Sequence, residues 1–420
     1  MGLLNVDSLK PGMILEKNLV AFNGRFLLPR GAVLTSGHIQ TMKVWGVVEA
    51  DIQGEEGCET DNKLETEIPK EILKQAEREV KALFSGPVLR SPMKEIYSLA
   101  LERRAMALKS GMEEPAPRKG SASFARGKKT GGSRIKGGIT PSDLVAQELR
   151  LASLPDVYYR IMEVINSARS SASHIAEAVS KDTSLVARLL KLVNSAFYGF
   201  PSKIDTVPRA VAIIGTKELS TLALGITAVQ YFNNIPPDFV DMKNFWTHSV
   251  ACGVYARLLA SEKVGVSEER LFVAGLLHDL GKLVIFRQIP FSAREAMELS
   301  EEKGIPVWQA EREVMGFDHS HVGALLLREW RIPAHLEAAV RFHHSPLPSS
   351  YSMESSLLNV ADSLAIAMGA GKSGSAVVPE IDVETWAATA LSGGVFQPVV
   401  RQGDRQIGDI TAAFLGNNGV

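Results

Sequence analysis

LFVAGLLHDLGKLVIF, residues 271–286, is the stretch on which the rest of this chain depends. Its apolar residues recur at helical spacing, which predicts one buried helix: Phe272, Leu276, Leu280 and Leu283. The same run contains His278 and Asp279, with Lys282 one turn later. Ionisable side chains in an apolar helix are unfavourable unless they are paired, hydrogen-bonded or bound to metal. The ionisable side chains of this stretch therefore require partners, and the best candidates are the histidines further along the chain.

The composition is that of an ordinary soluble globular protein. The chain has 420 residues, 45% hydrophobic and 22% charged, with a net charge of −1. This length suggests about two or three domains, and the charge gives no overall bias toward nucleic acid or a membrane surface. Cys58 and Cys252 are the two cysteines, which excludes a disulfide framework. With no export signal and no apolar run long enough to span a bilayer, we expect a cytoplasmic protein that does not bind membranes.

The first part of the chain divides into three predicted regions. Residues 1–55 predict a small β-rich domain with a hairpin at Asn23-Gly24, a helix over 36–44 and a final strand over 47–52. Residues 56–112 predict a helical connector. Residues 113–139 are rich in Gly, Ser, Lys and Arg and predict a flexible basic linker. A nucleic-acid contact is the weaker reading of that linker, and a solvated tether is the stronger one.

The remainder is predicted to be helical. A helix should begin at Thr140-Pro141-Ser142-Asp143, and the helical domain should extend over 140–395. After Ser375 the pattern becomes irregular, with a further helix expected near 384–391, and 396–420 is set apart as a C-terminal tail. The fold class is therefore mainly α, an all-helical domain preceded by a small β-rich domain.

Seven of the nine histidines lie between positions 248 and 344, and a lone acid, Asp362, follows them on an apolar run. Imidazole and carboxylate ligands suit Fe, Mn, Zn and Ni, and a carboxylate can bridge two metals. A single histidine on an apolar helix is more often a hydrogen-bonded core residue than a ligand. The ordered series, with each member on its own predicted helix, favours a metal site over a set of unrelated core histidines.

This series resembles the HD superfamily of metal-dependent phosphohydrolases, and residues 140–395 resemble its HDOD branch. The resemblance rests on LASLPDVYYRIMEVI, IAEAVSKDTSLVARLLKLVNSAFYGFPSKIDTVPRAVAIIGTKEL, FVAGLLHDLGKLVI, FDHSHVGALLLREWRIP and AVRFHHSP. The front segment is similar, over a shorter and looser match, to the small β-domain that precedes many HD-GYP-type bacterial signalling domains.

The resemblance implies a metal site for one or two divalent ions of the Fe, Mn, Mg or Zn type. It assigns one ion to His248, His278, Asp279 and Asp362, and a second to His319, His343 and His344 with Asp279 bridging. Lys282 matches the lysine that faces the phosphate in active relatives, so Asp279 and Lys282 would be the catalytic pair. We expect His321 to point away from the site and His335 to lie at the surface.

The resemblance also leaves the activity open. HD-GYP phosphodiesterases follow the His-His pair with a Gly-Tyr-Pro signature, whereas this chain continues as SPLPSSYSM. The HDOD family is regarded as a signalling output module, so the leading hypothesis is a non-catalytic bacterial signalling regulator that binds a partner protein. The alternative is a phosphohydrolase acting on a cyclic dinucleotide, another nucleotide or a phosphoester. The ligand set is compatible with a working hydrolase, a structural metal site, or a metal-free polar core, and no feature of the sequence points to an oligomeric state.

Overall fold

The computed structural model describes residues 2–20, 26–44, 47, 49–53, 68–84, 86, 88, 90–111, 138–151, 155–167, 171–195, 197–200, 202–232, 235 and 240–415. The predicted fold class is confirmed, because helices dominate and the strands are confined to the first 52 residues. Among these residues, no helix combines the length and apolar character that crossing a bilayer requires. The predicted linker over 113–139 lies outside the described residues except for Gly138 and Ile139, and the predicted domain boundaries stay predictions.

The N-terminal unit is a small β structure with its own core. Strand β1 (Gly2–Asn5) pairs antiparallel with β4 (Glu49–Ile52), and β2 (Leu19–Val20) pairs antiparallel with β3 (Phe26–Leu28). A 3-10 turn, η1 (Val6–Ser8), and helix α1 (Ser36–Val44) complete the unit. The antiparallel β2–β3 pair and the helix α1 confirm the predicted hairpin and helix, although the Asn23-Gly24 turn itself lies outside the described residues. The core gathers Val6, Leu9, Leu15, Leu19, Leu34, Met42, Val47, Ala50 and Ile52.

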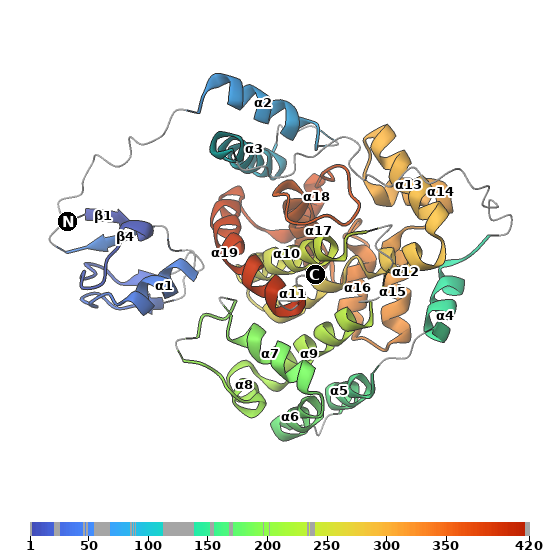
Figure 1. Ribbon diagram of the computed structural model, residues 1–420, viewed down its shortest axis with the longest axis horizontal. Helices are drawn as coiled ribbons and strands as arrows, with labels where there is room; N and C mark the ends of the chain where they lie inside the picture. The colour runs from blue at the N-terminus through green and yellow to red at the C-terminus, as the bar shows by residue number, and fades with distance from the viewer. Residues whose placement is uncertain are drawn as a thin grey trace.

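Two connector helices pack against the helical body. Helices α2 (Lys70–Lys81) and α3 (Met93–Ser110) lie side by side above α17 (Ser352–Ala367) and α19 (Phe396–Leu415) in Figure 1. An ion pair of 2.5 Å joins Arg104 Nε to Glu79 Oε2 between α2 and α3, and one of 2.8 Å joins Arg103 Nη2 to Asp404 Oδ1 of α19. The connector is therefore docked along one face, with Ala76 and Val80 buried in α2.

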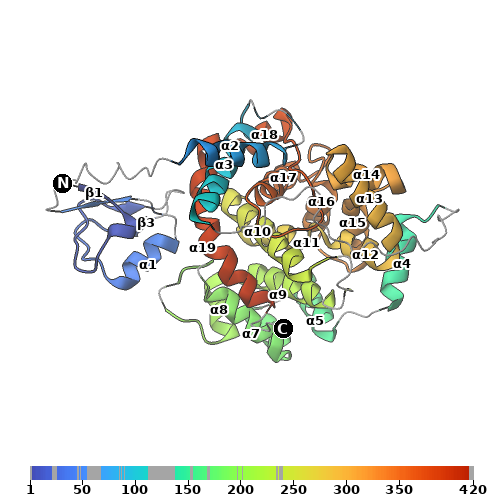
Figure 2. The ribbon, with the colours of Figure 1, turned by 45° about the horizontal axis from the view of Figure 1, so that its top comes forward.

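The helical body contains the remaining elements (Figures 1 and 2). Its first half comprises α4 (Pro141–Leu151), α5 (Asp156–Asn166), α6 (Ala172–Ser180), α7 (Thr183–Val193), α8 (Val207–Ile214), α9 (Thr216–Tyr231), α10 (Met242–Ala260) and α11 (Glu268–Leu277). Its second half comprises α12 (Leu280–Gln288), α13 (Pro290–Lys303), α14 (Val307–Met315), α15 (His319–Glu329), α16 (Ala334–Phe342), α17 (Ser352–Ala367), α18 (Val383–Thr389), the 3-10 turn η3 (Gly393–Val395) and α19 (Phe396–Leu415). The predicted helix start at Thr140 is confirmed, because the Thr140 backbone N–H donates to Asp143 Oδ2 at 2.9 Å.

Helix α10 lies at the centre of this body. Almost every residue from Phe245 to Ala260 is buried, and α10 packs against α11, α17 and α19. A helix that is buried on all sides must be surrounded by other helices, so α10 organises the core. Helix α19 covers one side of α10 and occupies most of the segment that the sequence sets apart as a tail. Phe396, Val399 and Ile410 of α19 are buried in the common core.

The predicted single helix over 271–286 is wrong, because the chain forms two helices that meet at His278 and Asp279. Helix α11 ends at Leu277, and α12 begins at Leu280. Asp279 has φ −97° and ψ 5°, and its backbone oxygen accepts a short-range hydrogen bond of 2.9 Å from the Lys282 N–H. The spacing of apolar residues does not indicate such a break, because one continuous helix and two successive helices would bury the same apolar residues. The break places the two ionisable side chains at a helix junction.

Glycine contacts bring the helices that carry this junction close together. A Cβ atom on Gly275 of α11 would overlap the backbone of Gly253 of α10. A Cβ on Gly281 of α12 would overlap the backbone oxygen of His319 at the start of α15. Both close approaches lie next to candidate ligands, so small residues set the spacing of the helices around the site.

Replacing Gly275 with alanine tests this packing. Because the added methyl group would meet backbone atoms that cannot move independently, Gly275→Ala should lower the free energy of unfolding by about 1–3 kcal/mol. Gly408→Ala is the matched control, since Gly408 lies in α19 and a Cβ there meets nothing within 4 Å. That control should raise stability by up to about 1 kcal/mol through helix propensity. Denaturant unfolding measures both, and equal stability of the two variants would contradict the close packing of α10 and α11.

Candidate metal centre

The fold brings all seven predicted ligands to one place from five parts of the helical body. His248 projects from the middle of α10, His278 and Asp279 lie in the α11–α12 junction, and Asp362 comes from α17. His319 begins α15, and His343 and His344 follow the end of α16. The side chains of the described residues form three groups with metal-ligand spacing, namely His319–His343–His344, His248–His278–Asp279 and Cys252–His278–Asp362, and the last two groups share His278.

The carboxylate of Asp279 lies at the centre of the site. Its Oδ2 is 3.4 Å from His278 Nε2 and 3.8 Å from His248 Nε2. Its Oδ1 is 3.2 Å from His319 Nε2 on the other side. Asp279 thus lies between the two groups, in the place that a bridging carboxylate would occupy.

The first group gathers around the second carboxylate. Asp362 Oδ1 is 3.1 Å from His248 Nε2 and 3.6 Å from His278 Nε2. The side chains of these residues are between 0% and 7% exposed. Two imidazoles and two carboxylates therefore converge in a space that is closed to bulk water.

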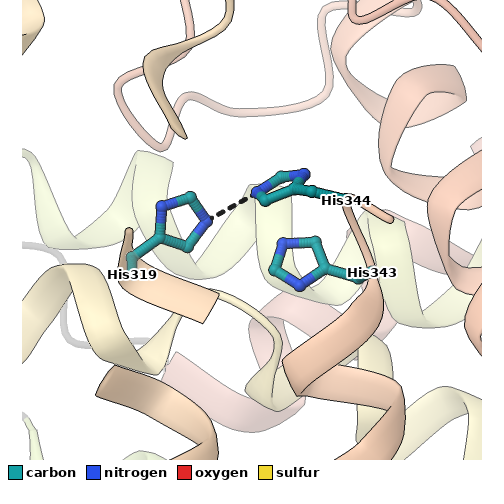
Figure 3. Close-up of side chains that lie close together, drawn as sticks. All are labelled: His319, His343 and His344. Atoms are coloured by element: carbon teal, nitrogen blue, oxygen red, sulfur yellow. Dashed lines mark hydrogen bonds between the residues drawn. The ribbon is translucent and has the colours of Figure 1, made fainter. Parts of the chain in front are cut away.

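The second group consists of three histidine rings (Figure 3). His344 Nε2 and His319 Nε2 face each other at 2.9 Å, as the dashed line in Figure 3 shows, and His343 lies directly beside His344. His319 and His343 are buried, whereas His344 is half-buried. This side of the site is consequently the one closer to solvent.

The outer nitrogens of three rings are held by hydrogen bonds. Nδ1–H of His278 donates to the backbone oxygen of Gly275 at 2.6 Å, and Nδ1–H of His343 donates to that of Val340 at 2.7 Å. Nδ1–H of His319 donates to Glu311 Oε2 at 2.6 Å. Backbone oxygens and an ionised carboxylate only accept, so each bond fixes a proton on Nδ1 and directs Nε2 toward the centre. This is the arrangement by which proteins orient metal-ligating histidines.

Several inward atoms lack a hydrogen bond. Nε2 of His248, His278 and His343 and Oδ1 of Asp279 are buried and have no hydrogen-bond partner of acceptable geometry among the described residues. Buried polar atoms without partners are rare in native proteins because each costs about 1–3 kcal/mol. Four such atoms converging on one place are the observation by which these residues fit a divalent metal ion.

The charges of the site are strongly coupled. Burial alone would lower the pKa of His278, but Asp279 and Asp362 hold it well above its ordinary value. Burial likewise lowers the pKa of His319, yet Glu311 and Asp279 raise it to about 9. Burial acts in the opposite direction on Asp279, and His278 and Lys282 bring its pKa well below the usual range. Two carboxylates are thus balanced by nearby positive charge, which a divalent cation can also supply.

Lys282 supplies part of that charge. Its Nζ donates to Asp279 Oδ2 at 2.8 Å and to Ser373 Oγ at 3.2 Å, and the residue is 4% exposed. The ammonium group is therefore directed at the bridging carboxylate. Ser373 belongs to the loop that follows α17, so this lysine also connects α12 to that loop.

The sequence did not reveal the supporting residues. Glu311 of α14 accepts from both the backbone N–H and Nδ1–H of His319, at 2.8 and 2.6 Å. Trp308 stacks on the His344 ring with centroids 5.3 Å apart, and Asn359 Nδ2 donates to the His343 backbone oxygen at 2.7 Å. Glu311 and Trp308 lie on α14, whereas the histidines they contact lie on other elements. The spacing of residues along the sequence therefore did not indicate these contacts. A buried acid on an amphipathic helix was the one available hint for Glu311.

Two of the seven histidines between positions 248 and 344 lie outside the site. His321, as expected, belongs to none of the metal-spaced groups of the described chain, and its backbone N–H donates to Asp318 Oδ1 at 3.0 Å. The expected surface position of His335 is wrong, because this side chain is half-buried. Burial, together with Arg270, lowers the pKa of His335 to about 4.

Comparison with known proteins relates part of the helical body to a known domain. Residues 151–346 match the model of the HDOD domain. The chain carries an HDOD domain. An uncharacterised protein of Treponema pallidum (strain Nichols) is 27% identical over 198 residues, which cover 46% of this chain and 38% of that relative. The chain thus matches well under half the length of its curated relative.

Two solved structures share the HDOD fold. A chain from Shewanella amazonensis SB2B, provisionally named a phosphohydrolase, is 24% identical with a TM-score of 0.50, over 64% of this chain and 98% of its own length. A chain from Marinobacter aquaeolei VT8, provisionally named a signal transduction protein, is 22% identical with a TM-score of 0.51, over 67% of this chain and 62% of its own. At these identities the likeness shows the fold alone.

The hydrogen bonds from Glu311 to His319 can be tested directly. Glu311→Ala should lower the free energy of unfolding by about 1–3 kcal/mol, because it leaves two buried N–H groups without an acceptor. Glu311→Gln keeps an acceptor and should lose less. Glu313→Gln is the control on the same helix, where an exposed ion pair with Lys303 contributes at most about 1 kcal/mol. Denaturant unfolding measures all three, and a Glu311→Ala variant as stable as Glu313→Gln would contradict the role of Glu311.

Proposed function

We propose that this chain is a signal-transduction protein whose HDOD domain is a partner-binding module built around a divalent metal centre. The observation that carries the proposal is a set of buried ligand atoms around Asp279 that have no hydrogen bond of acceptable geometry among the described residues. They come from α10, the α11–α12 junction and the segment that follows α16. One or two ions held there would connect these segments. In this proposal the metal stabilises the module, and partner recognition takes place on its outer surface.

Burial supports a stabilising role over an open catalytic one. The side chains of His248, Asp279 and His319 are 1%, 1% and 0% exposed. A phosphoester must reach the metal-facing atoms to react, and these atoms are enclosed by the packed helices. The missing Gly-Tyr-Pro signature is in keeping with this reading.

The signalling role rests on the family rather than on the site. The HDOD resemblance implies an output module, and the provisional name of the Marinobacter chain points in the same direction. The partner is proposed to be another signalling protein.

Each group of this chain has a defined task in the proposed centre. A bound divalent ion would supply positive charge and Lewis acidity. His248, His278 and Asp362 would hold it on one side of Asp279, and His319, His343 and His344 would hold a second ion on the other. Glu311 keeps the His319 ring in the tautomer that presents Nε2 inward. Lys282 neutralises the Asp279 carboxylate.

A second candidate function, phosphohydrolase activity, is favoured by one observation. Lys282 is held at the bridging carboxylate in the position where an active HD enzyme would need a cation for the phosphate. The half-buried side at His344 and Trp308 would be the entrance for a phosphoester, and Lys282 would have to exchange its bond to Ser373 for one to a phosphate oxygen. Asp279 and Lys282 would then be the catalytic residues.

Metal content tests the proposed centre. The purified full chain, loaded with Mn²⁺ or Fe²⁺ and dialysed, should retain about one or two ions per molecule in elemental analysis, as the ligand count allows. Asp279→Asn should retain fewer, because it removes the bridging charge. His321→Ala is the matched control beside His319 and should bind as the unmodified chain does. Removal of the metal by a chelator should lower the midpoint of thermal unfolding, since binding stabilises the folded state. A chain that retains no ion under any loading condition would contradict the proposal.

A turnover assay separates the two candidate functions. The metal-loaded chain should not hydrolyse a generic phosphodiester or a cyclic dinucleotide if the centre is structural. Turnover that Asp279→Asn abolishes and His321→Ala preserves would replace the module by the phosphohydrolase.

A further inference from the structure

A cysteine lies beside the metal centre without a part in the ligand set described above. Cys252 is on α10, one helical turn after His248, so both side chains lie on the same face of that helix. It is fully buried, and it forms no disulfide among the described residues. Its Sγ, a ring nitrogen of His278 and a carboxylate oxygen of Asp362 lie within 4.8 Å of one another.

The partners of Cys252 point to a ligand rather than to simple packing. His278 Nε2 and His248 Nε2 are buried and have no hydrogen bond of acceptable geometry among the described residues. His278 Nε2 is 3.6 Å from Asp362 Oδ1, and ligand atoms around a tetrahedral ion are separated by roughly that distance, given metal–ligand bonds of about 2.0–2.3 Å. A thiol that only filled space would be surrounded by apolar groups, whereas this one borders two polar side chains of the site.

We propose that Cys252 is a thiolate ligand of the ion held by His248, His278 and Asp362. The inference rests on the proposed metal centre. It adds one ligand residue to that centre and predicts which metal ions the centre prefers. On binding, a metal–sulfur bond replaces the S–H bond, and the proton leaves to solvent, so the step needs no oxidant or reductant.

The proposal determines which ions this position prefers. Thiolate is a soft ligand that favours Zn²⁺, Co²⁺ and Fe²⁺ over Mg²⁺ and Mn²⁺. A position made of two histidines, Asp362, the shared carboxylate of Asp279 and one thiolate therefore selects a borderline-soft ion. In the described part of the chain, the His319–His343–His344 group contains no cysteine, so it would not share this preference.

Cobalt spectroscopy of the full chain tests the proposal. The sequence contains two cysteines, so three proteins suffice: the unmodified chain, Cys252→Ala and the control Cys58→Ala. With Co²⁺, the unmodified chain and Cys58→Ala should show a sulfur-to-cobalt charge-transfer band in the near ultraviolet. Cys252→Ala should lose this band and keep the visible cobalt bands of the nitrogen and oxygen ligands. Competition experiments should show that Zn²⁺ affinity falls at least about tenfold in Cys252→Ala, because removal of a residue that only contacts a ligand already causes a loss of that size. The affinity for Mn²⁺ should change less.

The outcomes distinguish this inference from the proposed metal centre. Visible cobalt bands without a charge-transfer band in the unmodified chain would overturn the role of Cys252 and leave the metal centre standing. A charge-transfer band that disappears in Cys58→Ala would also overturn it. No cobalt bound to the unmodified chain, by elemental analysis, would overturn both. If Cys252→Ala has a lower unfolding midpoint, Cys252→Ser, which keeps a side chain of similar size, provides the same spectral comparison.

Discussion

The structure depends on the burial of one carboxylate, that of Asp279, at the junction of two helices. An isolated buried charge is unfavourable by many kcal/mol, so positive charge must surround it. Lys282, in the first turn of α12, contacts this carboxylate at 2.8 Å, and His278 and His319 contact it at 3.4 and 3.2 Å. Helices far apart in the sequence meet at this carboxylate, and the glycines at 253, 275 and 281 allow their backbones to approach it.

The same carboxylate can be neutralised in two ways. In the absence of an ion, Lys282 and the raised pKa values of His278 and His319 provide protons that balance Asp279 and Asp362. A divalent ion would replace those protons, and metal affinity is then expected to weaken as the pH falls. A site that tolerates both states would be compatible with both proposed uses of the helical body, the structural module and the hydrolase. What separates these uses is access of a substrate to the metal-facing atoms.

Much of the fold and of the site was predictable from the sequence. The order of histidines and acids indicated that residues from 248 to 362 would meet, and the structure brings those seven side chains together. The break at Asp279 was not predictable, because apolar residues recur at the same spacing in one helix or two. Glu311, Trp308 and Ser373 were missed since they act across space on partners from other elements. Cys252 was considered only as one of two cysteines that exclude a disulfide framework, although its position one turn after His248 contained the signal.

The most direct test of the account is anomalous diffraction from crystals of the full chain grown with Mn²⁺ or Zn²⁺, recorded at the absorption edge of each metal. The account predicts at least one strong peak within about 2.0–2.3 Å of an Asp279 oxygen and of inward Nε2 atoms, since these are ordinary metal–ligand distances. If the second position is filled, the ion would lie between His319 and His344, and their present 2.9 Å contact would be lost. Crystals without any peak near Asp279, with Lys282 and the histidines paired as they are here, would contradict it.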